Sequence, residues 1–127
     1  MKEKQKLVSI ILNCFNGKKY LKDALETVVN QTYNNWELVF WDNKSTDGSK
    51  KILDLYDSEK LKYYRSNVHT SLYEARNLAV KECKGEFIAF IDADDYWEKN
   101  KLEKQIKLFE KKMWEWFMEI CGFITKN

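Results

Sequence analysis

Residues 87–95 read Phe-Ile-Ala-Phe-Ile-Asp-Ala-Asp-Asp, an apolar run that leads directly into three acids, Asp92, Asp94 and Asp95. The run predicts a β-strand buried on both faces, because a strand with one solvent face alternates apolar and polar residues. Ligands of open parallel sheets bind beyond the carboxyl ends of the strands, where these acids follow. Crowded carboxylates repel one another unless a cation or proton compensates them. Their oxygens suit Mg²⁺ or Mn²⁺, so the stretch predicts a divalent-metal site; the alternative is a solvated acidic turn that caps the next helix.

Strand and helix patterns alternate along the rest of the chain. Apolar, β-branched runs predict strands at residues 7–12, 36–41 and 61–65, the last at an edge or a half-covered position. Helical spacing predicts a helix over 19–30 and three further helices. The second helix would bury Ile52, Leu53 and Tyr56, and the third would bury Leu72, Ala75, Leu78, Ala79 and Cys83. The fourth would bury Leu102, Ile106, Phe109 and Met113. Ser45 or Thr46 is the predicted N-cap of the second helix, and Thr70 or Ser71 that of the third. This alternation predicts a doubly wound, parallel α/β sheet.

Composition narrows the class of protein. The chain has 127 residues, enough for one domain with a single core, and a net charge of +2, too small to indicate nucleic acid as a partner. No apolar run is long enough to span a bilayer, and the charged N-terminus does not resemble a secretory signal, so we expect a cytoplasmic protein. Three widely spaced cysteines, Cys14, Cys83 and Cys121, predict reduced and mostly buried thiols rather than a zinc site or disulfides.

Four features would meet at one edge of this sheet: residues 13–16 after the first strand, Asp42 after the second, Arg76 on the third helix, and the acids. Together they predict a nucleotide pocket. An aromatic ring flanks a base, Asp42 accepts a hydrogen bond from a base N–H, and Arg76 binds phosphate or base oxygens through its planar fork. The acids would hold a metal that neutralises a diphosphate.

Each feature also has a purely structural alternative. Phe15 could pack in the core, Asp42 could cap a turn or helix, and Arg76 could pair with Glu74 or Asp47 on the surface.

Five motifs together resemble family 2 glycosyltransferases in order and separation. They are Val8-Ser9-Ile10-Ile11-Leu12-Asn13-Cys14-Phe15-Asn16, Gln31-Thr32-Tyr33, Trp41-Asp42-Asn43-Lys44-Ser45-Thr46-Asp47-Gly48-Ser49, Ala75-Arg76-Asn77 and Phe90-Ile91-Asp92-Ala93-Asp94-Asp95. The resemblance runs from about Leu7 to Lys112. It implies the N-terminal half of a GT-A fold, a Rossmann-like doubly wound, mostly parallel sheet flanked by helices. It also implies binding of a nucleotide-sugar and a divalent metal, and inverting transfer of the sugar to an acceptor hydroxyl.

Carried over by position, the resemblance implies specific roles. Asp94 is the expected metal ligand, and Asp92 is expected to meet the ribose or the metal shell. Asp42 and Arg76 are expected on the base side or the diphosphate side. The base pocket is expected to include Asn13 and Phe15.

The sequence differs from the family's usual pattern at two local positions and in one larger respect. The family usually has proline where Asn13 stands and Asp-Gly where Asn43-Lys44 stands, so the loop geometry there is open. The family's general base and acceptor-binding segment lie in a C-terminal half for which 127 residues leave no room. The catalytic residues therefore remain unknown.

Residues 113–127 are atypical of the family, and we assign residues 1–112 to the nucleotide-sugar-binding domain. The aromatic tail predicts one of three things: a membrane-surface helix, packing against the domain or a partner, or a slipped reading frame in a truncated gene product. The third is the preferred hypothesis, because the Met and Trp codons read two bases later give a β-rich phrase.

The leading functional hypothesis is the donor-binding domain of an inverting glycosyltransferase, expected in bacterial surface polysaccharide synthesis. Its expected partners are a UDP-sugar and a saccharide or lipid-linked saccharide acceptor, with membrane contact at most peripheral, at the inner face. The first alternative is a truncated, non-catalytic nucleotide-binding module. Another alternative is a phosphoacceptor receiver or an Asp-x-Asp phosphatase, which is disfavoured because those families place an acid where Asn13 stands.

Overall fold

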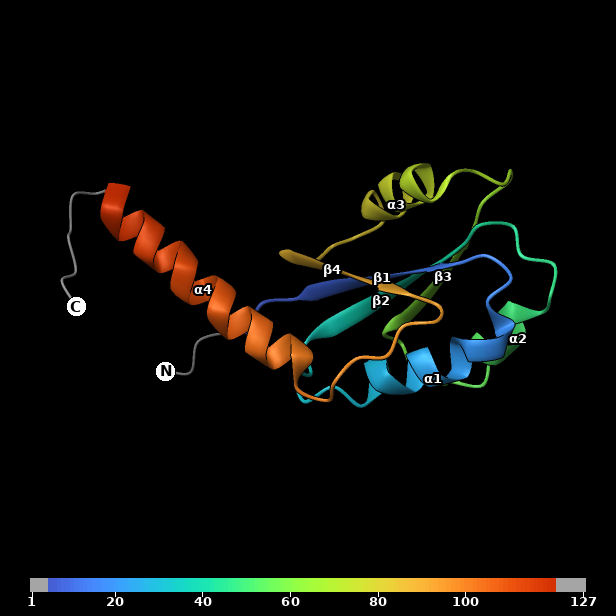
Figure 1. The fold of residues 1–127 in the computed structure, drawn as a ribbon, viewed down its shortest axis with the longest axis horizontal. Helices are drawn as coiled ribbons and strands as arrows, with labels where there is room; N and C mark the ends of the chain where they lie inside the picture. The colour runs from blue at the N-terminus through green and yellow to red at the C-terminus, as the bar shows by residue number, and fades with distance from the viewer. Residues whose placement is uncertain (1–4, 121–127) are drawn as a thin grey trace.

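The computed structural model describes residues 5–120, in which a four-stranded sheet carries helices on both faces (Figure 1). The elements follow in strict alternation: β1 (Val8–Cys14), α1 (Lys18–Val29), β2 (Trp36–Asp42), α2 (Ser49–Leu53), β3 (Leu61–Arg65), α3 (Leu72–Val80), β4 (Phe87–Asp92) and α4 (Lys101–Ile120). The predicted α/β alternation is confirmed.

All strand pairs of the sheet are parallel, in the order β3-β2-β1-β4. The chain moves outward from β1 to β3 and then crosses back to place β4 on the other side of β1. Such a reversal leaves a crevice between neighbouring loops at the carboxyl ends of the strands. The reversal here lies between β1 and β4, and it brings Asn13 into register beside Asp92.

Alternating residues of β1 face two separate apolar layers. Ile10 and Leu12 belong to the larger layer, which packs against α1, α2 and the first half of α4. Ile11 belongs to the smaller layer, which packs against Ala75 and Ala79 of α3. Figure 1 shows α3 alone on one face and α1 with α2 on the other, which is the doubly wound arrangement.

A buried polar network ties the start of β4 to β1 and β2. Glu37, 4% exposed, accepts hydrogen bonds from the Ser9 hydroxyl (2.7 Å), the Lys84 backbone N–H (2.7 Å) and Lys62 Nζ (2.6 Å). Ser9 in turn accepts from the Gly85 N–H at 2.8 Å. The network fixes how β4 enters the sheet at the amino ends of the strands.

The expectation that β4 is buried on both faces is wrong. Within the described residues β4 is an edge strand, and Ile88 and Phe90 are 41% and 45% exposed. Ile91, on the opposite face, is buried at 1%. The reason is lateral position: α3 packs over β1 and β2 and leaves much of the same face of β4 uncovered. By contrast, the edge position and half-burial predicted for β3 are confirmed.

The helices differ from the sequence expectation in their caps and inward residues. Helix α2 begins at Ser49, so its N-cap is Gly48, which has a φ of 81°, and the predicted cap at Ser45 or Thr46 is wrong. The helix ends at Leu53, before Tyr56. The cap of α3 is Ser71, as predicted, and its hydroxyl accepts from the Glu74 N–H. Three residues expected to face the core are about half exposed instead: Leu72, Phe109 and Met113.

Helix α4 continues without a break across residue 112, where the sequence analysis placed a boundary. Its second half extends away from the sheet (Figure 1) and exposes Met113, Trp114 and Trp116. Residues 121–127 lie outside the described part, so the hypotheses about the tail and its reading frame stay predictions. Within residues 5–120, no helix combines the length and apolarity needed to cross a bilayer. Of the described cysteines, Cys14 is buried and Cys83 half-buried, and both are free thiols.

Candidate functional site

The crevice between the ends of β1 and β4 holds a buried side chain with unmet hydrogen-bonding capacity. Asn13 is 7% exposed, and neither its Oδ1 nor its Nδ2 has a hydrogen-bond partner among the described residues. Leaving such a group unsatisfied costs about 1–3 kcal/mol. Natural proteins keep groups of this kind mainly where function or a bound molecule compensates them. Asn13 therefore marks this crevice as a place for a ligand.

Arg76 lies on the β4 side of the crevice. Its Nη2 is 3.4 Å from Asp92 Oδ1, and its guanidinium lies over the Phe90 ring at 5.4 Å. Its Nε is buried and has no hydrogen-bond partner in the described chain. The structural alternative of pairing with Glu74 or Asp47 is wrong, because the acid that Arg76 meets is Asp92. The sequence-predicted arginine and the sequence-predicted acid are thus brought together.

The three acids at the carboxyl end of β4 come close enough to share one cation. One carboxylate oxygen from each of Asp92, Asp94 and Asp95 lies within 4.8 Å of the other two. The turn is closed by two hydrogen bonds: Asp92 N–H to Asp95 Oδ2 at 2.9 Å, and Asp95 N–H to the Asp92 carbonyl at 3.0 Å. Oxygens on one Mg²⁺ ion are at most about 4.2 Å apart, so small rotations of these exposed side chains suffice. The donor set fits a hard divalent cation.

Asp42 ends β2, but its carboxylate already serves the fold. Oδ2 accepts from the Tyr63 hydroxyl at 2.6 Å and from Arg65 Nη1 at 2.9 Å, while Oδ1 accepts from the Ser45 N–H at 2.7 Å. Burial and the hydrogen bond to Asp42 raise the pKa of Tyr63. A carboxylate has about four lone-pair sites, so Oδ1 retains one, but the side chain is only 2% exposed. The alternative that Asp42 caps a turn is confirmed by the Ser45 bond, and the predicted base contact stays a prediction.

A cavity of about 260 Å³ is lined by two residues predicted for the base pocket, Asn13 and Phe15, and by His69, which was not predicted for the site. The exposed Phe15 ring meets the His69 ring, with centroids 4.1 Å apart. Asn43 holds this loop: its Nδ2 donates to the Thr70 carbonyl at 2.7 Å, and its Oδ1 accepts from the Thr70 N–H at 3.0 Å. Phe15 is 51% exposed, so the alternative of core packing is wrong. No local pattern indicates His69, because it follows β3 and reaches Phe15 only through the fold.

The loops after β1 and β2 brace each other. Asn16 N–H donates to Ser45 Oγ at 2.9 Å, and Thr46 N–H donates to Asn16 Oδ1 at 2.8 Å. Lys44 has a φ of 68°, a left-handed conformation in which a residue with a Cβ is strained. Lys44 occupies the position where family 2 glycosyltransferases, which the sequence resembles, usually have glycine.

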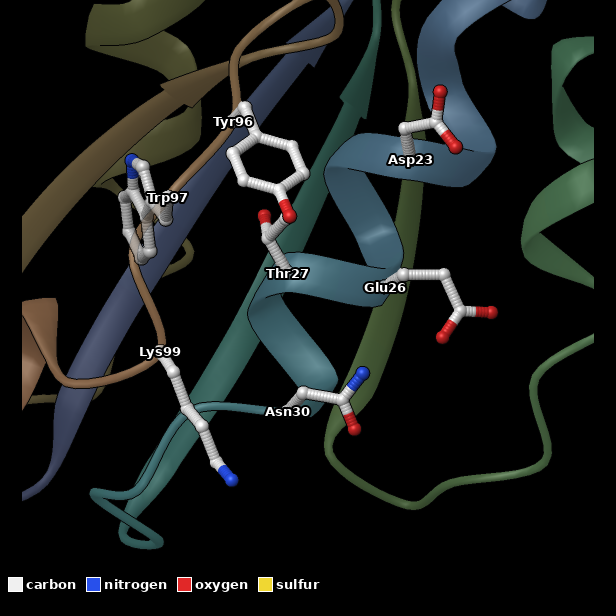
Figure 2. Close-up of a pocket in the computed structure, with 7 residues that line it drawn as sticks. All are labelled: Asp23, Glu26, Thr27, Asn30, Tyr96, Trp97 and Lys99. Carbon is white, nitrogen blue, oxygen red and sulfur yellow. The ribbon is translucent and has the colours of Figure 1, made fainter.

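A larger cavity, of about 490 Å³, lies between α1 and the segment after the acids (Figure 2). Its lining residues are Asp23, Glu26, Thr27, Asn30, Tyr96, Trp97 and Lys99, and it includes none of the predicted site residues. The smaller cavity is the better candidate, because it adjoins the strand ends and the unsatisfied Asn13.

Comparison with known proteins places the chain in a family. The family model described as glycosyl transferase family 2 matches residues 9–113. The chain belongs to glycosyl transferase family 2. Among solved structures, S. aureus TarS 1–349 in complex with UDP matches with a TM-score of 0.77 and 29% identity, over 82% of this chain and 32% of that chain. The mannosyltransferase PcManGT from Pyrobaculum calidifontis, in complex with GDP-Man and Mn²⁺, shares the fold with a TM-score of 0.69 and 24% identity, over 75% of this chain and 30% of PcManGT.

Curated members of the family extend well beyond the matched region. The Escherichia coli UDP-Glc:alpha-D-GlcNAc-diphosphoundecaprenol beta-1,3-glucosyltransferase WfgD is 41% identical over 83% of this chain, and the Escherichia coli enzyme of the same description, WfaP, is 36% identical over 82%. This family 2 chain spans 42% and 41% of their lengths. The match corresponds to the predicted N-terminal half of the GT-A fold.

Proposed function

We propose that this chain is the nucleotide-sugar-binding part of an inverting glycosyltransferase that works with a divalent metal. The observation that carries the proposal is the convergence at one crevice of unsatisfied polar atoms on Asn13 and Arg76 with the carboxylates that follow β4. A nucleoside diphosphate has the groups that this crevice lacks: a planar base with polar edges, and an anionic diphosphate.

The base would lie at the smaller cavity. A base stacks on an aromatic side chain with a stabilisation of about 1–3 kcal/mol, and the exposed Phe15 ring, supported by His69, offers such a surface. The Asn13 carboxamide offers one acceptor and two donors to a base edge, and Asp42 Oδ1 offers one further acceptor.

The diphosphate would lie beside Arg76 and the acids. Asp94 and Asp92 would hold Mg²⁺ or Mn²⁺, which when bound supplies Lewis-acid stabilisation of negative charge on the leaving diphosphate. Arg76 holds a fixed positive charge at the same place, and its planar fork suits phosphate oxygens. Charge stabilisation of this kind is a major part of catalysis when the donors are already in position.

We further propose a UDP-sugar as donor and a saccharide or lipid-linked saccharide hydroxyl as acceptor, in bacterial surface polysaccharide synthesis at the cytoplasmic face of the membrane. Support comes from the names of WfgD and WfaP and from the UDP bound to TarS. The general base and the acceptor contacts would belong to the C-terminal half of a complete enzyme.

Calorimetry with UDP, GDP and TDP, each with Mn²⁺ and with EDTA, tests the proposal. We expect UDP to bind more tightly with Mn²⁺, and Asp94→Ala to remove that metal-dependent gain. Asp57→Ala, which changes an exposed acid in the loop before β3, is the matched control and should leave the gain intact. Unchanged metal-dependent affinity in Asp94→Ala would refute the assignment. Binding of UDP-glucose without sugar transfer to any acceptor would favour the non-catalytic module instead.

A further inference from the structure

The segment between Asp92 and α4 carries Asp94 and Asp95, and it is held in place by a motif that the proposed site does not use. Residues 93–100 contain no helix or strand. Segments of this kind usually move more than the elements that they connect. Here the segment runs along α1, and its Trp97 and Lys99 line the same cavity as Thr27 and Asn30 of the α1 side (Figure 2). Trp97 is 6% exposed and packs in the larger apolar layer.

Gln31 fixes this segment with one buried carboxamide. It is 4% exposed. Its Nε2 donates to the carbonyls of Thr27 at 3.0 Å and Glu98 at 2.7 Å, and its Oε1 accepts from the Leu102 N–H at 3.1 Å. A single side chain therefore links α1, the acid-bearing segment and α4.

Two of these bonds complete helix ends. The Thr27 carbonyl lies in the last turn of α1, and the Leu102 N–H lies in the first turn of α4; such end groups have no partner within their own helix. Glutamine is suited to all three contacts because it carries donors and an acceptor on one planar group. Glutamate would keep the acceptor and set a carboxylate against two carbonyl oxygens.

Thr32 reinforces the same attachment. Its N–H donates to the Lys99 carbonyl at 2.9 Å, and its hydroxyl donates to Glu103 Oε2 at 2.9 Å. The acids are thereby anchored on both sides. Asp92 is paired with β1 in the sheet, and Glu98, four residues beyond Asp94, is bonded to Gln31.

We infer that Gln31 is a positioning residue for the metal-binding acids, acting by fixing residues 98–102 so that Asp94 stays within reach of the cation that Asp92 also meets. The inference rests on the proposed function, because it takes those acids to be the metal site. It assigns a role to the Gln31-Thr32 pair, whose side chains lie on the α1 side of the sheet rather than in the crevice.

The test compares UDP affinity with Mn²⁺ and with EDTA in the full chain. Gln31→Met keeps the size of the side chain and removes all three hydrogen bonds. We expect its affinity with Mn²⁺ to fall by about tenfold, the lower end of what loss of an orienting outer-shell partner costs, while its affinity in EDTA stays within about twofold. Thr32→Val, a milder change that removes only the hydroxyl bond to Glu103, should weaken the affinity with Mn²⁺ by about threefold and leave the affinity in EDTA unchanged.

Ser9→Ala is the matched control for lost stability. It removes hydrogen bonds at the opposite end of β1 and should leave both affinities unchanged. All titrations are made at a temperature where circular dichroism shows each variant folded. If Gln31→Met does not fold, the test uses Thr32→Val alone. Amide hydrogen exchange at residues 94–102 of Thr32→Val should then be faster than in wild type, and unchanged exchange together with unchanged affinity would overturn the inference.

The outcomes separate the inference from the proposed function. A loss confined to the Mn²⁺ value supports positioning. Equal losses with Mn²⁺ and EDTA, or none in the Gln31 and Thr32 variants, overturn it while the proposed function stands. A wild-type chain without any Mn²⁺-dependent gain overturns both.

Discussion

Replacing Glu37 by alanine should destabilise the fold strongly without altering the nucleotide site directly. The carboxylate is buried at the amino ends of the strands, where it accepts from Ser9, Lys84 and Lys62 at 2.6–2.7 Å. Alanine leaves the Ser9 hydroxyl, which is 0% exposed, without this acceptor. It also releases the backbone at Lys84, which leads into β4.

The loss in the free energy of unfolding can be estimated from the groups that lose their partner in each variant. Removing one partner of a buried ion pair costs about 3–5 kcal/mol. The Lys62 side chain is 33% exposed and can regain water, so the lower end, about 3 kcal/mol, applies. Glu37→Gln keeps the oxygen that accepts from Ser9 and Lys84 but replaces the oxygen that accepts from Lys62 with an amide NH₂ group. It loses the charge and the Lys62 hydrogen bond, which should cost about 1.5 kcal/mol. Against a total of about 5–15 kcal/mol for a typical domain, the alanine variant should lose a large share of its stability.

The pH dependence of stability gives an independent check on the role of Glu37. Burial raises the pKa of Glu37, but hydrogen bonds from Lys62, Ser9 and Lys84 outweigh it, so its pKa lies below the ordinary value of 4.5. A group with a lowered folded-state pKa stabilises the fold above its unfolded-state pKa, and that stabilisation is lost as pH falls through the folded value. The stability gap between wild type and Glu37→Gln should therefore be largest near neutral pH and shrink below about pH 4.5.

Urea unfolding, followed by tryptophan fluorescence between pH 3.5 and pH 7.5, measures these differences. An alanine variant that loses less than about 1 kcal/mol would contradict the assigned role of the ion pair. So would a gap between wild type and Glu37→Gln that widens on acidification.

Three further predictions concern the site and its supports. Phe15→Ala should weaken UDP binding by about 1–3 kcal/mol in calorimetry through lost stacking, and an unchanged Kd would remove Phe15 from the base pocket. Gly85→Ala should cost about 2–3 kcal/mol in urea unfolding, since its Cβ would lie 2.6–2.7 Å from the Ser9 nitrogen and the Leu7 carbonyl; a neutral effect would show that this strand entry can shift. Lys44→Gly should raise stability by about 0.5 kcal/mol, because relief of left-handed strain exceeds the entropy cost of glycine, and a lower thermal midpoint would refute that balance.

Much of the fold followed from local patterns, and the two main failures have separate causes. Apolar runs located all four strands within a residue or two, because the burial of a strand is recorded in its own sequence. The double-sided burial expected of β4 failed because the number of covered faces depends on which elements lie beside a strand. The N-cap of α2 was predicted too early because Ser45 and Thr46 are good capping residues, whereas the helix starts only after Gly48, which has a positive φ.

For the candidate site, the sequence alone determined the candidate acids, the arginine and the aromatic that follow the strands, because strand ends can be located from local hydrophobicity. Tertiary structure alone decided which side chains meet. Strand order sets Asn13 beside Asp92, and β3 lies next to β2, which commits most of Asp42 to Tyr63 and Arg65. Gln31 reaches Leu102 across 71 positions in the chain. Such partners depend on the topology of the fold, and a local sequence pattern cannot predict them.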